Sequence, residues 1–254
     1  MSHHIVEARD LYYQYPDDTK ALQGVSFRIT HGESVGIVGA NGAGKSTLLL
    51  HLIGILVPTA GTVRVGDYPL IKETLTNIRR SVGMIFQNPD DQLFMPTVFE
   101  DVAFGPRNQG LPNSEIESRV MQALERVGAA HLKDRPPYKL SGGEKRAVTI
   151  AAVLAMSPDI LVMDEPSAAL DPLTRRRLIN LLATFEHTKI IATHDLDLVL
   201  DICKRAIILE NGRIIADGPA LELFQNDRLL AEAHLERPLR LQACPVCNQK
   251  PGLS

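Results

Sequence analysis

The fold is decided by the stretch Gly39-Ala40-Asn41-Gly42-Ala43-Gly44-Lys45-Ser46-Thr47. An apolar run at residues 35–38 precedes it and another at residues 48–53 follows it, which is the strand-loop-helix setting of a phosphate-binding loop. Its glycines let the backbone curl so that successive N–H groups face one anion, and the following helix dipole adds positive potential. We expect Lys45 to reach the β- and γ-phosphates of a nucleotide and the Ser46 hydroxyl to bind Mg²⁺, because this small hard cation prefers oxygen. The alternative is a glycine-rich turn without a ligand.

A pair of carboxylates ends a second apolar run. Residues 160–163 lead directly into Asp164 and Glu165, and ligands of α/β sheets bind at the carboxyl ends of the strands. We expect Asp164 to hold Mg²⁺ through its water shell and Glu165 to polarise the attacking water as general base. Solvated loop charges would explain the pair equally well if it stood alone. Together with the phosphate loop, the pair favours hydrolysis over mere binding.

Composition narrows the class of protein. With 44% hydrophobic residues, the 254-residue chain can bury the core of one α/β domain or of two lobes that share a nucleotide site. The net charge of −3, with basic residues spread along the chain, provides no concentrated positive field for nucleic acid. The longest apolar stretch, residues 48–57, is well short of the roughly 20 residues that cross a bilayer as a helix.

The cysteines are expected to be reduced. Residues 1–10 carry no secretory pattern, so we expect a cytosolic location. Cys203 lies on the apolar run of an expected helix, where core packing is its expected use. Cys244 and Cys247 form a single C-x-x-C pair, which offers half of a tetrahedral zinc site. An incidental pair in the tail, metal binding and redox regulation all stay open.

The order of the apolar patterns predicts an α/β fold with a helical insertion. Short β-rich runs make the N-terminal part strand-rich; they are residues 5–8, 25–29, 34–38 and 62–65. Residues 112–128 have the spacing of an exposed amphipathic helix. Later apolar runs alternate with helical patterns, as buried parallel strands and their crossover helices do; the runs are residues 160–163, 190–192 and 206–209, and the helices residues 173–182 and 196–202. Residues 239–254 have a loop-like composition, typical of a loosely held tail.

The segment Leu140-Ser141-Gly142-Gly143-Glu144 adds a specific signal. Ser141 and Glu144 have the spacing of a capping box at the start of a helix over residues 142–156. A capping box does not explain two glycines in the first turn, which lower helix propensity but let backbone amides approach an anion. At this position the segment resembles the signature sequence of ATP-binding-cassette (ABC) ATPases. In that family two cassettes pair head to tail, so the resemblance implies that residues 141–144 meet the γ-phosphate held by a partner cassette.

The resemblance covers nearly all of residues 5–215 and implies an ATPase whose cofactors are ATP and Mg²⁺. It implies the P-loop NTPase fold of an ABC cassette: a RecA-like core, an N-terminal antiparallel β subdomain and an α-helical subdomain at about residues 87–155. The ABC ATPase domain would comprise residues 1–238. The nucleotide would contact Tyr15, Gly39, Asn41, Gly42, Ala43, Gly44, Lys45, Ser46 and Thr47. The Mg²⁺ would lie among Ser46, Gln87 and Asp164.

Three further positions take their roles from the resemblance. Tyr15 looks like the aromatic that stacks on adenine, and Tyr13 is a competing choice. The alternative is that Tyr15 is an ordinary strand residue with no role in binding. Gln87, at the end of an expected strand over residues 82–86, resembles the glutamine that senses Mg²⁺ and water. His194 resembles the histidine that contacts the γ-phosphate and fixes the geometry around the general base, although a lone histidine at a strand end is ordinarily structural.

Asp171 has two compatible interpretations. In Ser167-Ala168-Ala169-Leu170-Asp171 it resembles the loop that crosses the interface between two cassettes. It is equally suited to be the N-cap of the helix that Pro172 begins. The sequence does not decide whether the partner cassette is a second copy of this chain or a different chain.

A branch of the family is indicated by Phe86-Gln87-Asn88-Pro89-Asp90-Asp91-Gln92-Leu93-Phe94, which resembles the glutamine loop of energy-coupling-factor (ECF) transporters. Residues 97–106 support it. The resemblance implies an integral-membrane coupling protein, a substrate-binding membrane subunit and a second ABC ATPase chain as partners, with this chain at the cytoplasmic face of the membrane. The chain length and Cys244-Pro245-Val246-Cys247 favour cobalt or nickel as cargo. A vitamin is the alternative, because the membrane subunits determine the substrate.

The sequence argues against three rival functions. A soluble cassette ATPase of nucleic-acid repair or translation would show a coiled-coil insertion, a second cassette or a basic face, and the sequence shows none of these. An exporter or an amino-acid importer would differ in residues 88–94. A regulatory nucleotide-binding protein without turnover has no need for Glu165 as a base beside Asp164.

Overall fold

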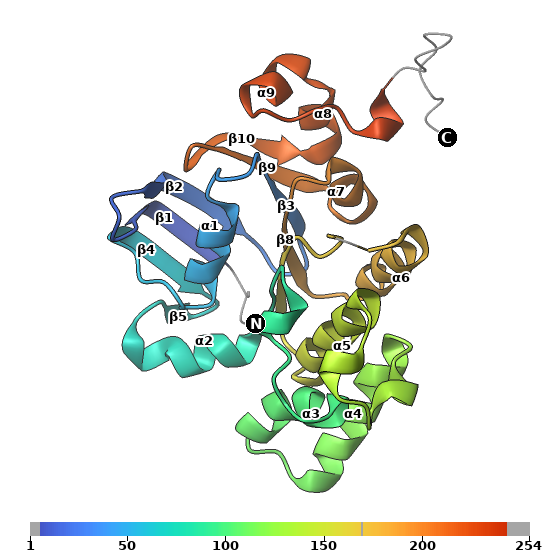
Figure 1. Ribbon diagram of the computed structural model, residues 1–254. Coiled ribbons are helices and arrows are strands. Elements are labelled where there is room, and N and C mark those ends of the chain that lie inside the picture. Colours follow the sequence, from blue (N-terminus) through green and yellow to red (C-terminus); the bar gives the residue numbers. More distant parts are fainter. Residues whose placement is uncertain (1–5, 169, 243–254) are drawn as a thin grey trace.

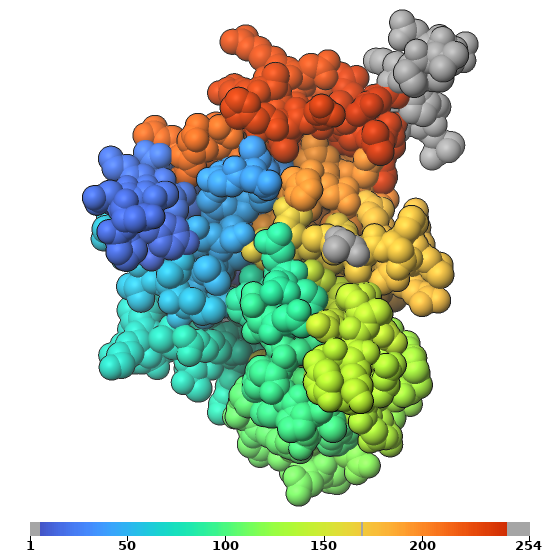
Figure 2. Space-filling view, viewed as in Figure 1, coloured from blue at the N-terminus to red at the C-terminus, as the bar shows by residue number. Residues whose placement is uncertain are grey.

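Two β-sheets and a group of helices make up the structure, a computed structural model that describes residues 6–168 and 170–242 (Figure 1). One sheet is antiparallel, the other is mostly parallel, and a helical part lies at one end of the molecule. Figure 2 shows this helical part, in green, at the end opposite the C-terminal residues in red. The mixed fold class expected from the sequence is confirmed.

The antiparallel sheet has the strand order β2-β1-β4-β5. Its strands are β1 (Val6–Gln14), β2 (Lys20–Ile29), β4 (Ala60–Val65) and β5 (Tyr68–Pro69). The first two are longer than the runs expected at residues 5–8 and 25–29. The register of β1 shifts after Ala8, where Asp10 has a left-handed φ of 46° and its N–H donates to Ser26 Oγ at 2.8 Å. This bulge interrupts the alternation by which a strand is identified in a sequence.

The second sheet has the order β10-β9-β3-β8-β7-β6. Its strands are β3 (Ser34–Val38), β6 (Val82–Ile85), β7 (Ile160–Asp164), β8 (Thr188–Thr193), β9 (Arg205–Glu210) and β10 (Arg213–Pro219). Five strands are parallel and β10 pairs antiparallel at one edge. Every residue of β7 and β8 is buried, which confirms the prediction of central parallel strands covered on two faces.

Helices cover the two faces of the parallel sheet. Between the sheets lies α1 (Lys45–Leu52), whose leucines share one buried cluster with both sheets. Opposite it lie α6 (Pro172–Ala183) and α7 (Leu196–Ile202), which contribute to a second buried cluster. The approach of α7 to β3 is close, because a Cβ atom at Gly36 would lie 2.6 Å from the Val199 side chain.

The helical part contains α3 (Val98–Asn108), α4 (Asn113–Arg126) and α5 (Gly142–Ala155), which pack against one another. Short 3₁₀ turns lie at Pro89–Asp91, Ala130–Leu132 and Pro137–Lys139. The amphipathic helix expected over residues 112–128 is α4, which buries Ile116, Val120, Ala123 and Leu124. Before the helical part come a turn at Lys72–Thr74 and α2 (Leu75–Ser81). Among the described residues, no helix is both long and apolar enough to cross a membrane.

The chain continues after β10 through α8 (Ala220–Gln225), α9 (Asp227–Glu232) and a 3₁₀ turn at Leu239–Leu241. Residues 239–242 differ from the expected loosely held tail, because Leu241 is buried in the cluster that includes α7. Cys203, directly after α7, is buried as expected, and burial raises the pKa of its thiol to about 12. Cys244 and Cys247 lie outside the described residues.

Candidate nucleotide site

The predicted site residues follow the carboxyl ends of three neighbouring strands. The phosphate loop follows β3, Asp164 ends β7, and His194 comes directly after β8. In the sheet, β8 lies between β3 and β7, so these three segments meet at one edge. This is the edge at which α/β sheets bind their ligands.

The phosphate loop is tight against protein on one side and open on another. A Cβ atom at Gly44 would lie 2.5 Å from the main-chain oxygen of Ala21, and one at Gly39 would lie 2.3 Å from that of Leu209. Gly42, in contrast, has a φ of 83°, and a Cβ atom there would meet no atom of the described residues within 4 Å. No side chain among the described residues caps the N-terminus of α1. Its first N–H groups are therefore left for an anion, as the motif predicts.

Lys45 is buried at the start of α1. Its ammonium donates to the main-chain oxygens of Gly39 at 2.8 Å and Ala40 at 3.0 Å. Burial lowers the pKa of Lys45, and the charges of Glu165 and Asp164 raise it. The ammonium thus lies at the loop already, where phosphate oxygens would offer it stronger, charge-assisted partners than carbonyls do.

Two predicted Mg²⁺ ligands, Asp164 and Ser46, lie close together. Asp164 is buried, and its Oδ1 has no hydrogen-bond partner in the described part of the chain. Burial raises the pKa of Asp164, and a hydrogen bond from the Ser46 hydroxyl acts in the opposite direction. An unpaired buried carboxylate oxygen beside a hydroxyl is a donor set that suits a hard cation. The residues present therefore fit Mg²⁺.

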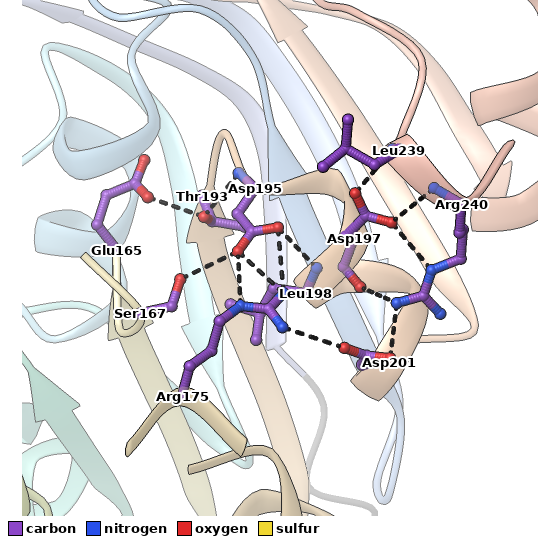
Figure 3. Close-up of polar contacts among 10 residues, drawn as sticks. All are labelled: Glu165, Ser167, Arg175, Thr193, Asp195, Asp197, Leu198, Asp201, Leu239 and Arg240. Atoms are coloured by element: carbon purple, nitrogen blue, oxygen red, sulfur yellow. Dashed lines mark hydrogen bonds and ion pairs between the residues drawn. The ribbon is translucent and has the colours of Figure 1, made fainter. Parts of the chain in front are cut away.

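Glu165 is buried and turned towards the end of β8. Its Oε2 accepts from the Thr193 hydroxyl at 2.8 Å (Figure 3). Its Oε1 accepts from the main-chain N–H of His194 at 3.1 Å and lies 2.8 Å from Nδ1 of the same residue. The backbone of Glu165 has a left-handed φ of 44°, and its N–H donates to Ala192. The structure thus joins the predicted base and the predicted histidine directly, with Thr193 as a partner that the motifs did not indicate.

The two candidate tyrosines have different neighbours. The Tyr15 hydroxyl lies 3.0 Å from Thr47 Oγ1, in the phosphate loop. Tyr13 makes edge-to-face contacts with Tyr15, at 5.0 Å between centroids, and with buried His51, at 4.7 Å. Tyr15 is therefore the tyrosine bonded to the nucleotide loop, and the partly buried Tyr13 contacts both Tyr15 and His51. Which ring stacks on adenine stays a prediction.

The signature segment forms the N-terminus of α5. Ser141 Oγ accepts from the Glu144 N–H at 3.3 Å, and Glu144 Oε2 accepts from the Ser141 N–H at 2.7 Å. The predicted capping box is confirmed, and these bonds hold the pKa of Glu144 below its usual value. A Cβ atom at Gly142 would have no atom from the described part of the chain within 4 Å, and one at Gly143 would lie 3.7 Å from Thr174. The first turn of α5 is thus open to an approaching group.

A cleft of about 1130 Å³ lies between the helical part and α6. Its lining includes Ser141, Gly143 and Glu144 of the signature segment, and Asp171 at the start of α6. None of residues 39–47, all of which are described, lines it. The Asp171 side chain accepts from the N–H groups of Leu173 and Thr174, both at 3.0 Å, which confirms its N-cap interpretation. Its interface role stays a prediction.

Gln87 lies two residues beyond β6, which ends at Ile85, one residue earlier than expected. Its side chain is exposed at the surface, whereas its main-chain oxygen accepts from Arg146. Arg146 also donates to the Phe86 oxygen at 2.6 Å and is itself buried. No motif in the sequence indicates this arginine. The available signal was a charged residue on the otherwise uncharged buried face of α5.

Comparison with known proteins places the chain in a family. Residues 22–168 match the family described as ABC transporter. The chain therefore belongs to the ABC transporter ATP-binding proteins, and the predicted family, fold class and ATPase activity are confirmed. It is an ATP-binding subunit of an ABC transporter.

Individual relatives refine this result. A putative ABC transporter ATP-binding protein of Geobacter sulfurreducens is 65% identical over 249 residues, which cover 98% of this chain and 100% of the relative. The energy-coupling factor transporter ATP-binding protein EcfA of Methanocaldococcus jannaschii is 44% identical over 255 residues, with coverage of 98% and 91%. The solved structure of cbiO1 from Clostridium perfringens, described as part of the ABC transporter complex cbiONQ, has a TM-score of 0.79 and 40% identity, and the match covers 90% of this chain and 93% of that one.

Proposed function

We propose that this chain is the ATP-hydrolysing subunit of an ECF importer and that Glu165 is its general base. The likeness to EcfA and cbiO1 supports the branch. The observation that carries the hydrolytic role is the buried Glu165 carboxylate, fixed by Thr193 and His194 at the sheet edge that bears the phosphate loop. A carboxylate held there is placed to accept a proton from water that attacks the γ-phosphate.

Nucleotide binding uses the groups around α1. Lys45 exchanges its two carbonyl partners for phosphate oxygens, while the loop N–H groups hold the β- and γ-phosphates. Ser46, Asp164 and Gln87 would hold Mg²⁺, which when bound offsets the charge of the phosphates. Asp164 Oδ1 supports this assignment, because it is buried without a protein partner among the described residues.

Hydrolysis requires the Glu165 carboxylate to face the attacking water. Its bonds to Thr193 and His194 limit its orientation and keep one oxygen, Oε1, next to the imidazole. The His194 side chain is 63% exposed, so its ring can meet a γ-phosphate while its Nδ1 and main-chain N–H stay on Glu165. His194 thus positions the base and contacts the phosphate in this proposal.

The nucleotide site needs a second cassette. Ser141, Gly142 and Gly143 lie at the open start of α5, and the cleft that Ser141 and Gly143 border is lined by no residue of this chain's phosphate loop, residues 39–47, all of which are described. Head-to-tail pairing would place a nucleotide held by one chain against α5 of the other, where N–H groups and the helix dipole stabilise the γ-phosphate. Asp171, on the same cleft, would lie at that interface.

The membrane partner docks, in this proposal, beside the Gln87 segment. Phe94 is 62% exposed and Phe104 is 40% exposed. Their rings contact edge-to-face, with 5.0 Å between the ring centroids. Two exposed aromatic rings in contact are typical anchors for a partner helix. The occupant that we propose is the integral-membrane coupling protein, which would hold this chain at the cytoplasmic face of the membrane.

The cargo that we propose is cobalt or nickel, with a vitamin as the alternative. The pair Cys244 and Cys247 is the sequence feature that favours the metal, because thiolates bind transition metals. The relatives named EcfA fit either cargo. In this proposal the membrane subunits select the substrate, so the nucleotide site of this chain does not distinguish a metal from a vitamin.

Purification of the tagged chain from its native membrane in mild detergent tests the proposal. We expect an integral coupling protein and a small membrane-embedded binding subunit to co-purify, with cobalt or nickel bound to the latter. Recovery of a vitamin in place of the metal would correct the cargo only. Recovery of soluble partners alone would contradict the transport function.

A further inference from the structure

A polar network extends from Glu165 to residues that no nucleotide motif includes (Figure 3). The Thr193 hydroxyl that donates to Glu165 also accepts from the main-chain N–H of Asp195 at 3.0 Å. Asp195 is the N-cap of α7, because its Oδ1 accepts from the Leu198 N–H at 2.9 Å. The turn that carries His194 is therefore fixed on one side by Glu165 and on the other by the start of α7.

Arg175 of α6 binds the same Asp195 carboxylate. Its Nε and Nη2 lie 3.2 Å and 3.1 Å from Oδ2, and Nη2 lies 3.3 Å from Oδ1. The Ser167 hydroxyl donates to Oδ2 as well, at 3.3 Å. A planar guanidinium that makes several bonds to one carboxylate fixes both direction and distance, which a lysine cannot do.

These bonds close a ring around the segment that leads to the cassette interface. The Ser167 side chain donates to Asp195, and Asp171 caps the N-terminus of α6. Arg175, in the first turn of α6, donates to the same Asp195 carboxylate. The main-chain N–H of Arg175 donates to Asp171 at 2.9 Å, so the side chain and the cap are rigidly related. Arg175 thus joins the Asp171 end of this segment to the turn that orients Glu165.

The C-terminal turn holds this arrangement from the other side of α7. Arg240 donates to Asp201 Oδ1 at 2.7 Å and to Asp197 Oδ1 at 2.9 Å, and the Leu239 N–H donates to Asp197 Oδ2 at 2.8 Å. The second Asp201 oxygen lies 3.6 Å from Nη1 of Arg175. Asp201 therefore stands between two arginines, and Arg240 takes the oxygen that Arg175 does not face.

We propose that Arg175 is a positioning residue for ATP hydrolysis and that Arg240 controls its position through Asp201. Without Arg240, Asp201 keeps Arg175 as its one cationic partner among the described residues and draws it away from Asp195, which loosens the Thr193–Glu165 bond. Residues 239–242 are then part of the catalytic support rather than a tail. The inference rests on the proposed role of Glu165 as base.

The test is steady-state ATP hydrolysis by the full chain with Arg175→Ala and Arg240→Ala, alone and together. We expect Arg175→Ala to lower kcat roughly 10- to 100-fold, as misplacement of a reacting group does, with KM for ATP unchanged. We expect Arg240→Ala to lower kcat roughly two- to five-fold, the range for partly exposed ion pairs. Because both act through Asp195, the second substitution should add nothing to the first.

Arg237→Ala is the matched control. Arg237 also lies in the C-terminal segment and pairs with Asp227 at 2.7 Å, but within the described part of the chain Asp227 forms no ion pair with α7. We expect wild-type kcat for Arg237→Ala, although its thermal stability should fall by about as much as that of Arg240→Ala. Arg175→Lys should recover little activity, since an ammonium cannot reproduce the forked contact.

The outcomes separate this inference from the proposed function. Wild-type kcat in Arg240→Ala, additive losses in the double variant, or an equal loss in Arg237→Ala would each overturn the network, even if Arg175→Ala proves unable to fold. If Glu165→Gln keeps wild-type turnover, the base assignment fails instead. Loss of turnover in Glu165→Gln with full activity in the arginine variants would refute the positioning role alone.

Discussion

The guanidinium of Arg146 donates to the main-chain oxygen of Phe86 at 2.6 Å, so the helix that begins with the signature segment is bonded to the residues before Gln87. A further bond reaches the Gln87 oxygen, and the neighbouring Lys145 pairs with Asp90 at 2.6 Å. The start of α5 and the Gln87 segment are therefore linked within one chain. A displacement of α5 by a partner's nucleotide would move the proposed docking surface at Phe94 with it.

Loss of the Arg146 guanidinium should destabilise the protein. Arg146→Met leaves two main-chain oxygens without their charged donor, and we expect the free energy of unfolding to fall by about 2 kcal/mol in urea titrations. Arg119→Met is the control, because Arg119 forms a half-exposed pair with Glu115. That variant should lose less than about 1 kcal/mol. Equal losses in the two variants would show that the Arg146 bonds add no stability.

Adenine stacking should depend on the ring of Tyr15 and not on its hydroxyl. We expect Tyr15→Ala to raise KM for ATP roughly tenfold, within the range for loss of a base-stacking ring, and Tyr15→Phe to change it little. Tyr13→Ala should mainly reduce thermal stability, because Tyr13 packs against buried His51. A tenfold rise in KM with Tyr13→Ala but not with Tyr15→Ala would transfer the stacking role to Tyr13.

Removal of the Asp164 charge should stabilise the nucleotide-free protein while it abolishes turnover. Burial raises the pKa of Asp164, so the folded state binds protons more tightly there than the unfolded state does. The ionised form therefore costs stability above the folded pKa, and this cost disappears as pH falls below the ordinary value of 3.8. With a chelator present, we expect the free energy of unfolding of Asp164→Asn at pH 7 to exceed that of the wild-type protein by on the order of 1 kcal/mol, with a correspondingly higher Tm. This difference in Tm should become smaller towards pH 4.

Two measurements complete the Asp164 test. Addition of Mg²⁺ and ATP should raise the Tm of the wild-type protein more than that of Asp164→Asn, since the carboxylate then has its cation. A lower Tm of Asp164→Asn at pH 7 in chelator would mean that this carboxylate is already well stabilised by protein groups.

The proposed membrane contact should depend on the exposed aromatic pair. We expect Phe94→Asp to abolish co-purification of the membrane subunits, because a charge would enter an apolar contact, while the basal ATPase activity of the chain persists. Tyr68→Asp is a matched control, since Tyr68 is a 39% exposed aromatic residue in the antiparallel sheet, away from the helical part. Retention of the membrane subunits by Phe94→Asp would place the docking surface elsewhere.

Local patterns in the sequence predicted the parts of the structure that depend on local chemistry. The capping box at Ser141 and the central strands before Asp164 are confirmed because neighbouring residues and apolar runs determine them. The full length of β1 was not predicted, since the bulge at Asp10 depends on Ser26 of another strand.

The supporting residues of the site escaped prediction for a related reason. Arg146 and Arg175 have no motif of their own, and their partners lie 59 or 60 and 20 positions away in the sequence. Likewise, the order of residues 239–242 depends on Asp197 and on the burial of Leu241. Such contacts are a product of the folded chain and follow from its topology rather than from spacing.

The central claim is that Glu165 activates water for hydrolysis, and the turnover of Glu165→Gln tests it most directly. Glutamine keeps the size of the side chain but cannot accept the proton. The account predicts unchanged ATP binding, a loss of kcat of at least about 100-fold and accumulation of a nucleotide-bound dimer. Hydrolysis of ATP by Glu165→Gln at the wild-type rate would contradict it.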